Sequence, residues 1–154
     1  MEQPKERFKL IPAVYLVLRK DDKVLLLRRA NTGYQDGLYG LVAGHLDGDE
    51  GATEAMAREA KEEAGIVIDP NHLRFVHVSH RLSRNEIGQE RIDIFFEATQ
   101  WMGEIVNVEP HKCDDLAWFS VSELPEAMIP FVRLVLIDIV NGTSYSEYVT
   151  EPTE

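Results

Sequence analysis

The sequence has one cysteine in 154 residues, which excludes two kinds of small-protein framework. An internal disulfide network and a cysteine-rich zinc site both need several cysteines. Long hydrophobic runs are also missing. No stretch approaches the ~18 apolar residues of a membrane span, and the N-terminal MEQPKERFKL lacks the apolar core of a signal peptide. These absences predict a cytoplasmic protein with no membrane partner.

Linker-like stretches rich in proline, glycine or serine are absent as well, and the chain contains no internal repeat. A length of 154 residues is typical of one domain with one hydrophobic core. We therefore expect a single domain over residues 1–142. The remaining residues, 143–154, are acidic, and we expect them to form a flexible C-terminal tail.

Positive charge is scarce, because 16 Lys and Arg residues oppose 27 Asp and Glu residues, a formal net charge of −11. Such an acidic protein repels extended polyanions, so we expect no extended nucleic acid as a partner. A small phosphorylated substrate remains compatible if metal cations mediate the contact. The charge is uneven: residues 47–63 hold seven acidic and two basic residues, whereas residues 1–46 hold eight basic and five acidic ones.

The chain contains both strand-type and helix-type segments. Clusters of β-branched and apolar residues predict strands at 8–18, 24–27, 38–42, 72–82, 91–98 and 116–119. Helix-forming patterns predict helices at 52–64, which ends at Gly65, and at 131–140, with one helical turn at 122–125. Strands and helices do not alternate regularly, so the predicted fold class is α+β with a mixed sheet.

Three glutamates of the predicted helix at 52–64 share one face. At 100° per residue, Glu59, Glu62 and Glu63 lie within an arc of ~100° and within one turn. Neighbouring carboxylates repel one another, and near a helix C-terminus they also oppose the helix dipole. Taken alone, this face is compatible with solvated surface or with a site for a hard cation. Mg²⁺ prefers carboxylate oxygens and keeps water ligands for substrate phosphates.

A longer pattern across residues 44–66 includes these glutamates. It reads Gly, five residues, Glu, seven residues, Arg-Glu, two residues, Glu-Glu, one residue, Gly and an aliphatic residue. Its positions are filled by Gly44, Glu50, Arg58, Glu59, Glu62, Glu63, Gly65 and Ile66. Seven fixed matches in one window have a chance probability on the order of 10⁻⁸. In this motif the chain resembles the Nudix hydrolase (MutT-like) family, although Ala60, Val42 and Ala43 depart from the usual residues.

The resemblance covers residues ~8–141 and implies a Nudix fold, in which a mixed β-sheet is sandwiched between helices (α/β/α). It also implies divalent-metal chemistry at the motif. Carried over by position, the metal ligands are Glu59, Glu62, Glu63 and the carbonyl oxygen of Gly44. The implied cofactor is Mg²⁺, for which Mn²⁺ is the expected substitute.

Further roles follow from the same resemblance. Glu50 and Arg58 are implied to form a structural pair that ties the loop to the helix. Either Glu63 or Glu109, in a later acidic segment, is the general base. Arg29, the second residue of an Arg-Arg-Ala run, is the implied substrate-binding arginine, with a solvated strand edge as the alternative.

The implied function is a Mg²⁺-dependent pyrophosphohydrolase. It would cleave a nucleoside di- or triphosphate, or a related nucleoside diphosphate derivative, by attack of metal-activated water on phosphorus. The alternative is a catalytically silent Nudix-fold module that senses a nucleotide or a sugar; such modules usually lose the motif glutamates that are retained here. An isoprenoid diphosphate isomerase would need a cysteine-centred site, which Cys113 does not obviously supply.

The expected partner is a small phosphorylated substrate, and homodimers are frequent in the family. Three arginines flank the polar segment 83–90, where they contact substrate, contact a second subunit or are solvated: Arg81, Arg84 and Arg91. The sequence leaves open which derivative is the substrate, which phosphoanhydride bond is cleaved and how many metal ions bind.

Overall fold

The computed structural model describes residues 1–84 and 89–150, and in these residues eight strands form one mixed sheet. The strands are β1 (Ile11–Lys20), β2 (Lys23–Arg29), β3 (Tyr39–Gly40), β4 (Val42–His45), β5 (Arg74–Ser83), β6 (Arg91–Ala98), β7 (Cys113–Ser120) and β8 (Tyr145–Thr150). The helices are α1 (Ala52–Ala64) and α2 (Pro130–Val140), with a short 3₁₀ helix η1 at Pro70–His72.

Strand β1 is the centre of the sheet. Its middle residues are nearly all buried, as expected for an apolar strand that is covered on both faces. It pairs in parallel with β6 along Ile11–Leu18 and antiparallel with β4 along Ala13–Leu16. At its end it turns into β2, which in turn pairs with β3 and β7. Beyond β6 the sheet continues through β5 to β8. The predicted mixed sheet is confirmed.

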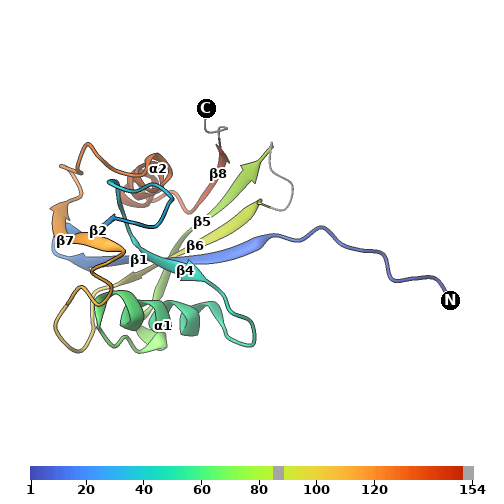
Figure 1. The fold of residues 1–154 in the computed structure, drawn as a ribbon, viewed down its shortest axis with the longest axis horizontal. Helices are drawn as coiled ribbons and strands as arrows, with labels where there is room; N and C mark the ends of the chain where they lie inside the picture. Colours follow the sequence, from blue (N-terminus) through green and yellow to red (C-terminus); the bar gives the residue numbers. More distant parts are fainter. Residues whose placement is uncertain (85–88, 151–154) are drawn as a thin grey trace.

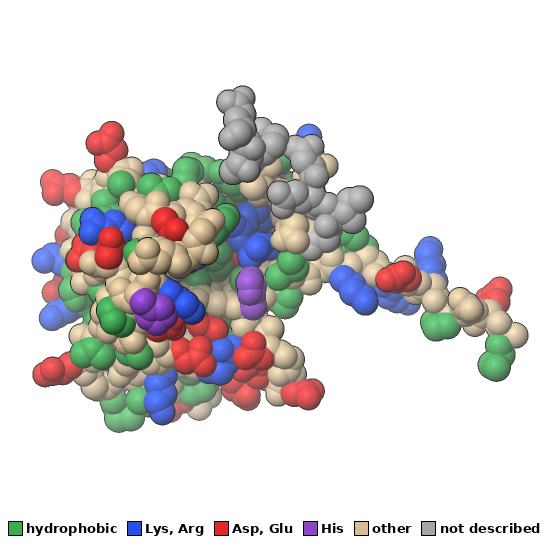
Figure 2. All heavy atoms as spheres, in the orientation of Figure 1, with side chains coloured by type: hydrophobic (Ala, Val, Ile, Leu, Met, Phe, Trp, Pro, Cys, Tyr) green, Lys and Arg blue, Asp and Glu red, His purple; other side chains and the backbone are tan. Residues whose placement is uncertain are grey.

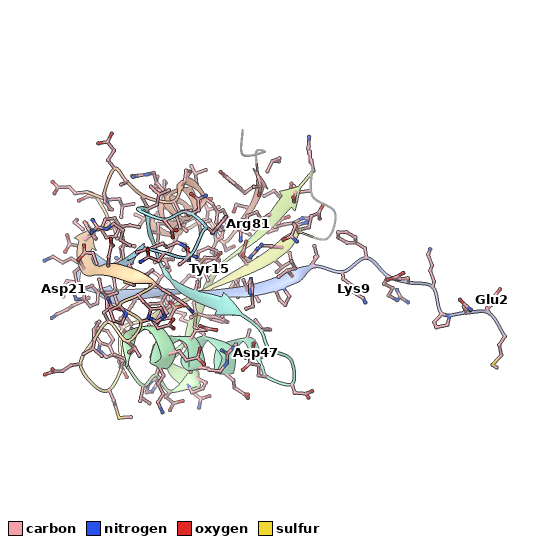
Figure 3. All side chains as sticks on the ribbon, in the orientation of Figure 1. Glu2, Lys9, Tyr15, Asp21, Asp47 and Arg81 are labelled. Atoms are coloured by element: carbon pink, nitrogen blue, oxygen red, sulfur yellow. The ribbon has the colours of Figure 1, made fainter. Side chains whose placement is uncertain are left out.

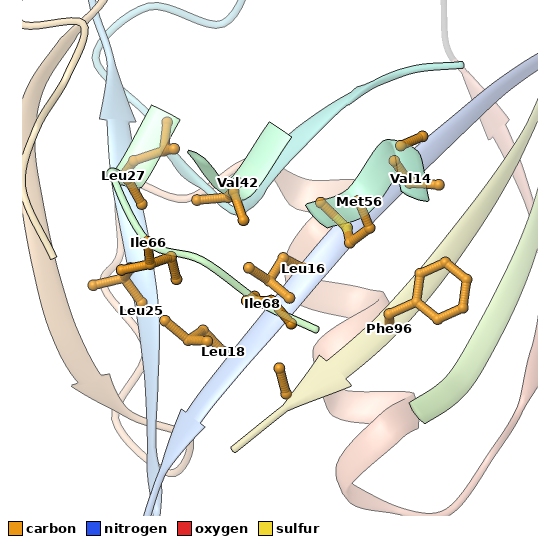
Figure 4. Close-up of a cluster of buried hydrophobic side chains, with 14 of the residues drawn as sticks. Val14, Leu16, Leu18, Leu25, Leu27, Val42, Met56, Ile66, Ile68 and Phe96 are labelled. Atoms are coloured by element: carbon orange, nitrogen blue, oxygen red, sulfur yellow. The ribbon is translucent and has the colours of Figure 1, made fainter. Parts of the chain in front are cut away.

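The two helices cover opposite faces of this sheet, as Figure 1 shows for α1 and α2 on either side of β1. Helix α1 packs into one core cluster and α2 into a second. In the first cluster Met56 lies among apolar side chains from three strands, including Leu16, Leu25 and Val42 (Figure 4). The α+β sandwich that the sequence predicts is therefore confirmed.

Helix α1 has the predicted bounds. Its buried residues are small apart from one methionine (Ala55, Met56, Ala60 and Ala64), which lets the helix axis approach the sheet closely. The helix ends at Gly65, whose φ of 68° lies in the left-handed region that glycine adopts without strain. This close packing sets the glutamates of the last turns beside β4.

One predicted helical turn, at 122–125, is wrong. The chain there forms a turn without helix. The Ser120 hydroxyl accepts a hydrogen bond from the backbone N–H of Ser122 and donates to the carboxylate of Asp22. These side-chain bonds stabilise the turn in place of a helical backbone pattern.

The prediction of a flexible tail is wrong for residues 145–150, which form β8. This strand pairs in parallel with β5, from Val78↔Tyr145 to Ser83↔Thr150. The Ser146 hydroxyl lies 2.8 Å from Nε2 of the buried His77. The acidity of residues 143–154 favours a flexible tail, but their tyrosines, valine and threonine favour strand structure, and the edge of β5 offers a partner. Residues 151–154 of the predicted tail lie outside the described residues.

At the other end of the chain, residues 1–10 extend away from the sheet without regular secondary structure (Figure 1). Across the described ranges, no helix has the length and apolar character needed to cross a bilayer.

Candidate active site

The loop between β4 and α1 joins the two halves of the motif. After β4 the chain reverses at Gly48 and Asp49, whose φ angles of 93° and 53° are both left-handed. Gly51 then leads into α1 with an extended backbone. Figure 3 labels Asp47 in this loop, between the end of β4 and the start of α1. The reversal lays the end of β4 alongside the glutamate face of the helix.

Gly44 is required by this close approach. A Cβ atom built at Gly44 would lie 2.1 Å from the carboxyl carbon of Glu59, well inside contact distance. Any other residue would displace the Glu59 side chain. The glycine therefore leaves room for a carboxylate directly against the backbone of β4.

A cavity of about 430 Å³ opens between this loop, α1 and the segment before β7. Five carboxylates line it: Asp47, Glu59, Glu62, Glu63 and Glu109. The backbone of Gly44 and the side chains of Arg29 and Lys112 also border it. Figure 2 shows acidic side chains gathered around basic ones on the face over α1. All four predicted catalytic glutamates thus line one cavity.

Glu63 has the least favourable electrostatic environment of these carboxylates. Burial raises the pKa of Glu63 to about 8, and the negative charges of Glu59 and Glu109 act in the same direction. The backbone N–H of Ala43 donates to Glu63 Oε2 at 3.3 Å, which offsets little of this. Burial likewise raises the pKa of Glu59. A bound cation would stabilise the ionised form of both groups.

Arg58 ties the loop to the helix. Its guanidinium donates to both carboxylate oxygens of Glu50, at 2.8 and 3.2 Å, and to the carbonyl oxygen of His45 at 3.1 Å. It also donates to Glu59 Oε1 at 2.8 Å. Glu50 accepts a further hydrogen bond from the backbone N–H of Asp47. The pair that the motif predicts is present, and Arg58 also contacts two predicted metal ligands, Glu59 and, at 3.5 Å, Glu62.

Arg29 borders the cavity from β2. Its guanidinium donates to the carbonyl oxygen of Tyr34 at 2.8 Å and to the Thr32 hydroxyl at 3.2 Å, and it lies over the Tyr34 ring. Its neighbour Arg28 instead forms an ion pair with Asp114 at 2.6 Å and is not a lining residue. The alternation of a strand therefore brings one of the two arginines to the cavity.

Glu109 reaches the cavity from the segment before β7. Its backbone carbonyl accepts hydrogen bonds from the N–H groups of Lys112 and Cys113, which form a tight turn. Its carboxylate lies 3.2 Å from the Lys112 ammonium and is partly exposed. The turn thus places the Glu109 carboxylate at the cavity that the helix glutamates also line.

The oxygen atoms that line the cavity are of the types that bind a hard divalent cation. Carboxylates and a backbone carbonyl are the ligands that Mg²⁺ uses, and the buried charge of Glu59 and Glu63 calls for a counter-ion. Over residues 1–84 and 89–150, however, no three His, Cys, Asp or Glu side chains come close enough to hold a metal ion. The Glu59 carboxylate is turned toward Arg58 instead.

A second group of charged residues lies outside the motif, and spacing in the sequence does not bring its members together. Arg81, on β5, forms a two-pronged ion pair with the fully buried Asp93 on β6, with both N–O distances at 3.0 Å. Arg81 also donates to the hydroxyl of Tyr15 on β1. An aspartate within the apolar run of β6 was the available signal, since a buried charge needs a partner.

The raised pKa of Glu63 predicts how stability depends on pH in metal-free protein. Between the ordinary glutamate pKa of 4.5 and about 8, the folded state holds a proton that the unfolded state has lost. Stability therefore falls as pH rises through this window, and the penalty is complete above pH 8. We expect the difference in unfolding free energy between wild type and Glu63→Gln to change by a few kcal/mol from pH 5 to pH 8 in chelator.

Urea unfolding at a series of pH values measures this difference, and adding Mg²⁺ should stabilise wild type more than the variant. Taking the difference cancels the titration of other groups, such as His45, whose pKa is lowered by burial and by Arg91. A difference that stays constant from pH 5 to pH 8 would show that Glu63 is not held in this environment.

Comparison with known proteins assigns the chain to a family. Residues 9–138 match the model of the NUDIX domain. Among curated proteins, the NAD-capped RNA hydrolase NudC of Escherichia coli O157:H7 is 28% identical over 123 residues, covering 79% of this chain and 44% of NudC. The chain thus spans about half the length of the curated relatives it matches.

Solved structures show the same fold. A MutT NUDIX hydrolase from Burkholderia pseudomallei superposes with a TM-score of 0.75 at 25% identity, covering 84% of this chain and 97% of that one. A MutT protein from Bacillus halodurans also has a TM-score of 0.75, at 21% identity, covering 93% and 92%.

Proposed function

Because the chain belongs to the NUDIX domain family, as its motif predicts, we propose that it is a Mg²⁺-dependent pyrophosphohydrolase of small nucleotide-derived diphosphates. One observation carries the proposal: glutamates from α1 and from the segment before β7 line one cavity beside the backbone of β4. A purely structural role does not account for half-buried carboxylates whose pKa values are raised by burial and by neighbouring acidic groups.

The residues that would hold Mg²⁺, or Mn²⁺ in its place, are Glu59, Glu62, Glu63 and the carbonyl oxygen of Gly44. When bound, the metal neutralises phosphate charge and lowers the pKa of a water molecule for attack on phosphorus. Arg58 would then keep Glu50 and the loop in place while giving up its contact with Glu59. Arg29 supports the proposal as a phosphate ligand because its guanidinium faces the same cavity.

Two carboxylates are candidates for the group that accepts the proton of the attacking water. Glu63 is half-buried and accepts a hydrogen bond from the backbone N–H of Ala43, whereas the Glu109 side chain is 29% exposed and pairs with Lys112. A group that also ligates metal has less capacity to take up a proton. We therefore propose Glu109 as the general base and Glu63 as a ligand.

The proposed function is tested with a panel of nucleoside diphosphate derivatives that includes ADP, ATP, ADP-ribose, NADH and a dinucleoside polyphosphate. The NudC relatives, named as NAD-capped RNA hydrolases, are the reason for including NADH. Products are identified by phosphorus NMR, with Mg²⁺ or with chelator. We expect at least one compound to be cleaved at a phosphoanhydride bond with Mg²⁺ alone; ligand-dependent thermal stabilisation without any cleavage would instead favour the sensor.

Replacing Arg58 by Lys is expected to raise the Mg²⁺ concentration needed for half-maximal activity by about 10- to 100-fold. The ammonium cannot reproduce the two-pronged contact with Glu50 while also contacting the loop carbonyl, so the loop and Glu59 lose their orientation. The measurement is a Mg²⁺ titration of initial rate. Lys61→Gln, on the same helix but exposed, is the matched control and should leave the titration unchanged.

We also propose three general properties of the protein. The protein acts as a single domain, it works in the cytoplasm, and it pairs as a homodimer. Gel filtration with light scattering at several concentrations tests the last of these.

A further inference from the structure

A second cavity, of about 230 Å³, adjoins the carboxylate cavity and has the opposite charge. The two share Arg29, Ala43, Gly44 and His45 as lining residues. Among the residues that the structure describes, no acidic one lines the second cavity beyond this shared wall. Its further polar side chains are Tyr15, Tyr34, Arg81 and Arg91.

Three guanidinium groups thus face one small volume. Arg81 is neutralised by Asp93, which lies behind it and is fully buried. Arg29 and Arg91 form no ion pair with a carboxylate within the described part of the chain. The cavity therefore carries an excess of positive charge in a protein whose net charge is −11.

The arrangement is also rigid. The ion pair with Asp93 and the hydrogen bond to the Tyr15 hydroxyl fix Arg81, whose guanidinium also lies 4.4 Å from the centre of the Phe131 ring. Figure 3 shows the labelled side chains of Tyr15 and Arg81 beside each other. The guanidinium of Arg91 lies 2.9 Å from Nε2 of His45, a contact that restrains it against the cavity wall. Donors fixed in this way bind an anion without first having to be ordered.

We propose that this second cavity, the cationic subsite, binds a phosphate group of the substrate that is not part of the cleaved linkage. The proposal rests on the proposed function, since it assumes that the diphosphate occupies the carboxylate cavity. Guanidinium groups match the oxygens of a phosphate with paired hydrogen bonds. Because the two cavities share a wall, one molecule can place a diphosphate in the first and a further phosphate in the second. The preferred substrate class is therefore a nucleoside diphosphate derivative with an additional phosphate.

That phosphate has two chemical sources, which matched substrates separate. NADPH differs from NADH by one phosphate on a ribose, and ATP differs from ADP by one phosphate at the end of the chain. For wild type we expect kcat/KM to be about tenfold higher for the phosphorylated member of one pair. Preference for NADPH would show that the cationic subsite binds a ribose phosphate, and preference for ATP would show that it binds a terminal phosphate. Equal values within both pairs overturn the proposal.

Arg91→Gln should abolish the preference by raising KM for the phosphorylated member only, and Arg91→Lys should restore part of it. Arg74→Gln is the matched control, because Arg74 is an exposed arginine of β5 outside both cavities. A variant that lowers kcat/KM equally for both members of the preferred pair overturns the proposal, since a merely structural arginine would act in that way.

Inorganic phosphate, titrated in chelator and followed by amide NMR shifts, tests the cationic subsite without catalysis. We expect saturable shifts near Tyr15 and Arg91, with about tenfold weaker binding in Arg91→Gln and unchanged binding in Arg74→Gln. If wild type cleaves no compound, the proposed function fails, but this titration still shows whether the cationic subsite binds phosphate. Phosphate that causes no saturable shift, or binding that Arg91→Gln leaves unaltered, overturns the proposal.

Discussion

Replacing Glu63 by Gln is expected to lower kcat for diphosphate cleavage by about 10³-fold, the largest effect of any single change in the cavity. The amide has the size of the carboxyl group but lacks the charge that a bound cation needs. In metal-free protein the change removes an unfavourable buried charge, so the variant should fold at least as stably as wild type above pH 8. Lost activity would then not reflect unfolding.

The matched control is Glu54→Gln, which removes the same charge from the exposed first turn of α1. It should retain wild-type kcat. Glu109→Gln separates the two roles: a general base should lose kcat at unchanged affinity for Mg²⁺, whereas a ligand should lose affinity. Full activity in Glu63→Gln would remove this glutamate from the catalytic assignment.

Replacing Asp93 by Asn is expected to reduce the free energy of unfolding by about 3–5 kcal/mol, the largest stability loss among the changes considered. Asp93 is fully buried and is the ion-pair partner of Arg81, so its removal leaves a guanidinium charge in the interior. A loss of this size is a large share of the ~5–15 kcal/mol that stabilises a typical domain. Urea unfolding at pH 7 with two spectroscopic probes measures it.

Glu97→Gln provides the comparison on the same strand. Glu97 pairs with Arg74 at 2.8 Å, but that arginine is largely exposed, so the loss should stay below about 1 kcal/mol. Replacing both buried partners, with Arg81→Met and Asp93→Leu together, should recover much of the stability. A cost for Asp93→Asn no larger than that for Glu97→Gln would contradict a desolvated ion pair.

The fold could be predicted where local pattern and tertiary structure agree. Helix α1 has its alanine stripe and its terminal Gly65 in consecutive residues, so its bounds follow from sequence alone. The tail shows the opposite case. Residues 145–150 are a short segment within an acidic stretch of the chain. They form β8 only because the edge of β5 is available to pair with them. Pairing between distant segments has no signature within either segment.

The same distinction applies to the site. Glu59, Glu62 and Glu63 lie on one helix, so helical geometry alone places them on one face. Arg81 and Asp93 meet only because β5 pairs antiparallel with β6 in one particular register. The cationic subsite therefore could not be assembled from spacing, although each of its residues is visible in the sequence.

An anomalous difference map from a crystal grown with Mn²⁺ tests the central claim most directly, because it locates the cation that the carboxylate cavity is proposed to hold. The account predicts a peak coordinated by Glu59, Glu62, Glu63 and the carbonyl oxygen of Gly44, with the Glu59 carboxylate released from Arg58. A cavity without a peak at saturating Mn²⁺, or a peak only at carboxylates elsewhere on the surface, would contradict it.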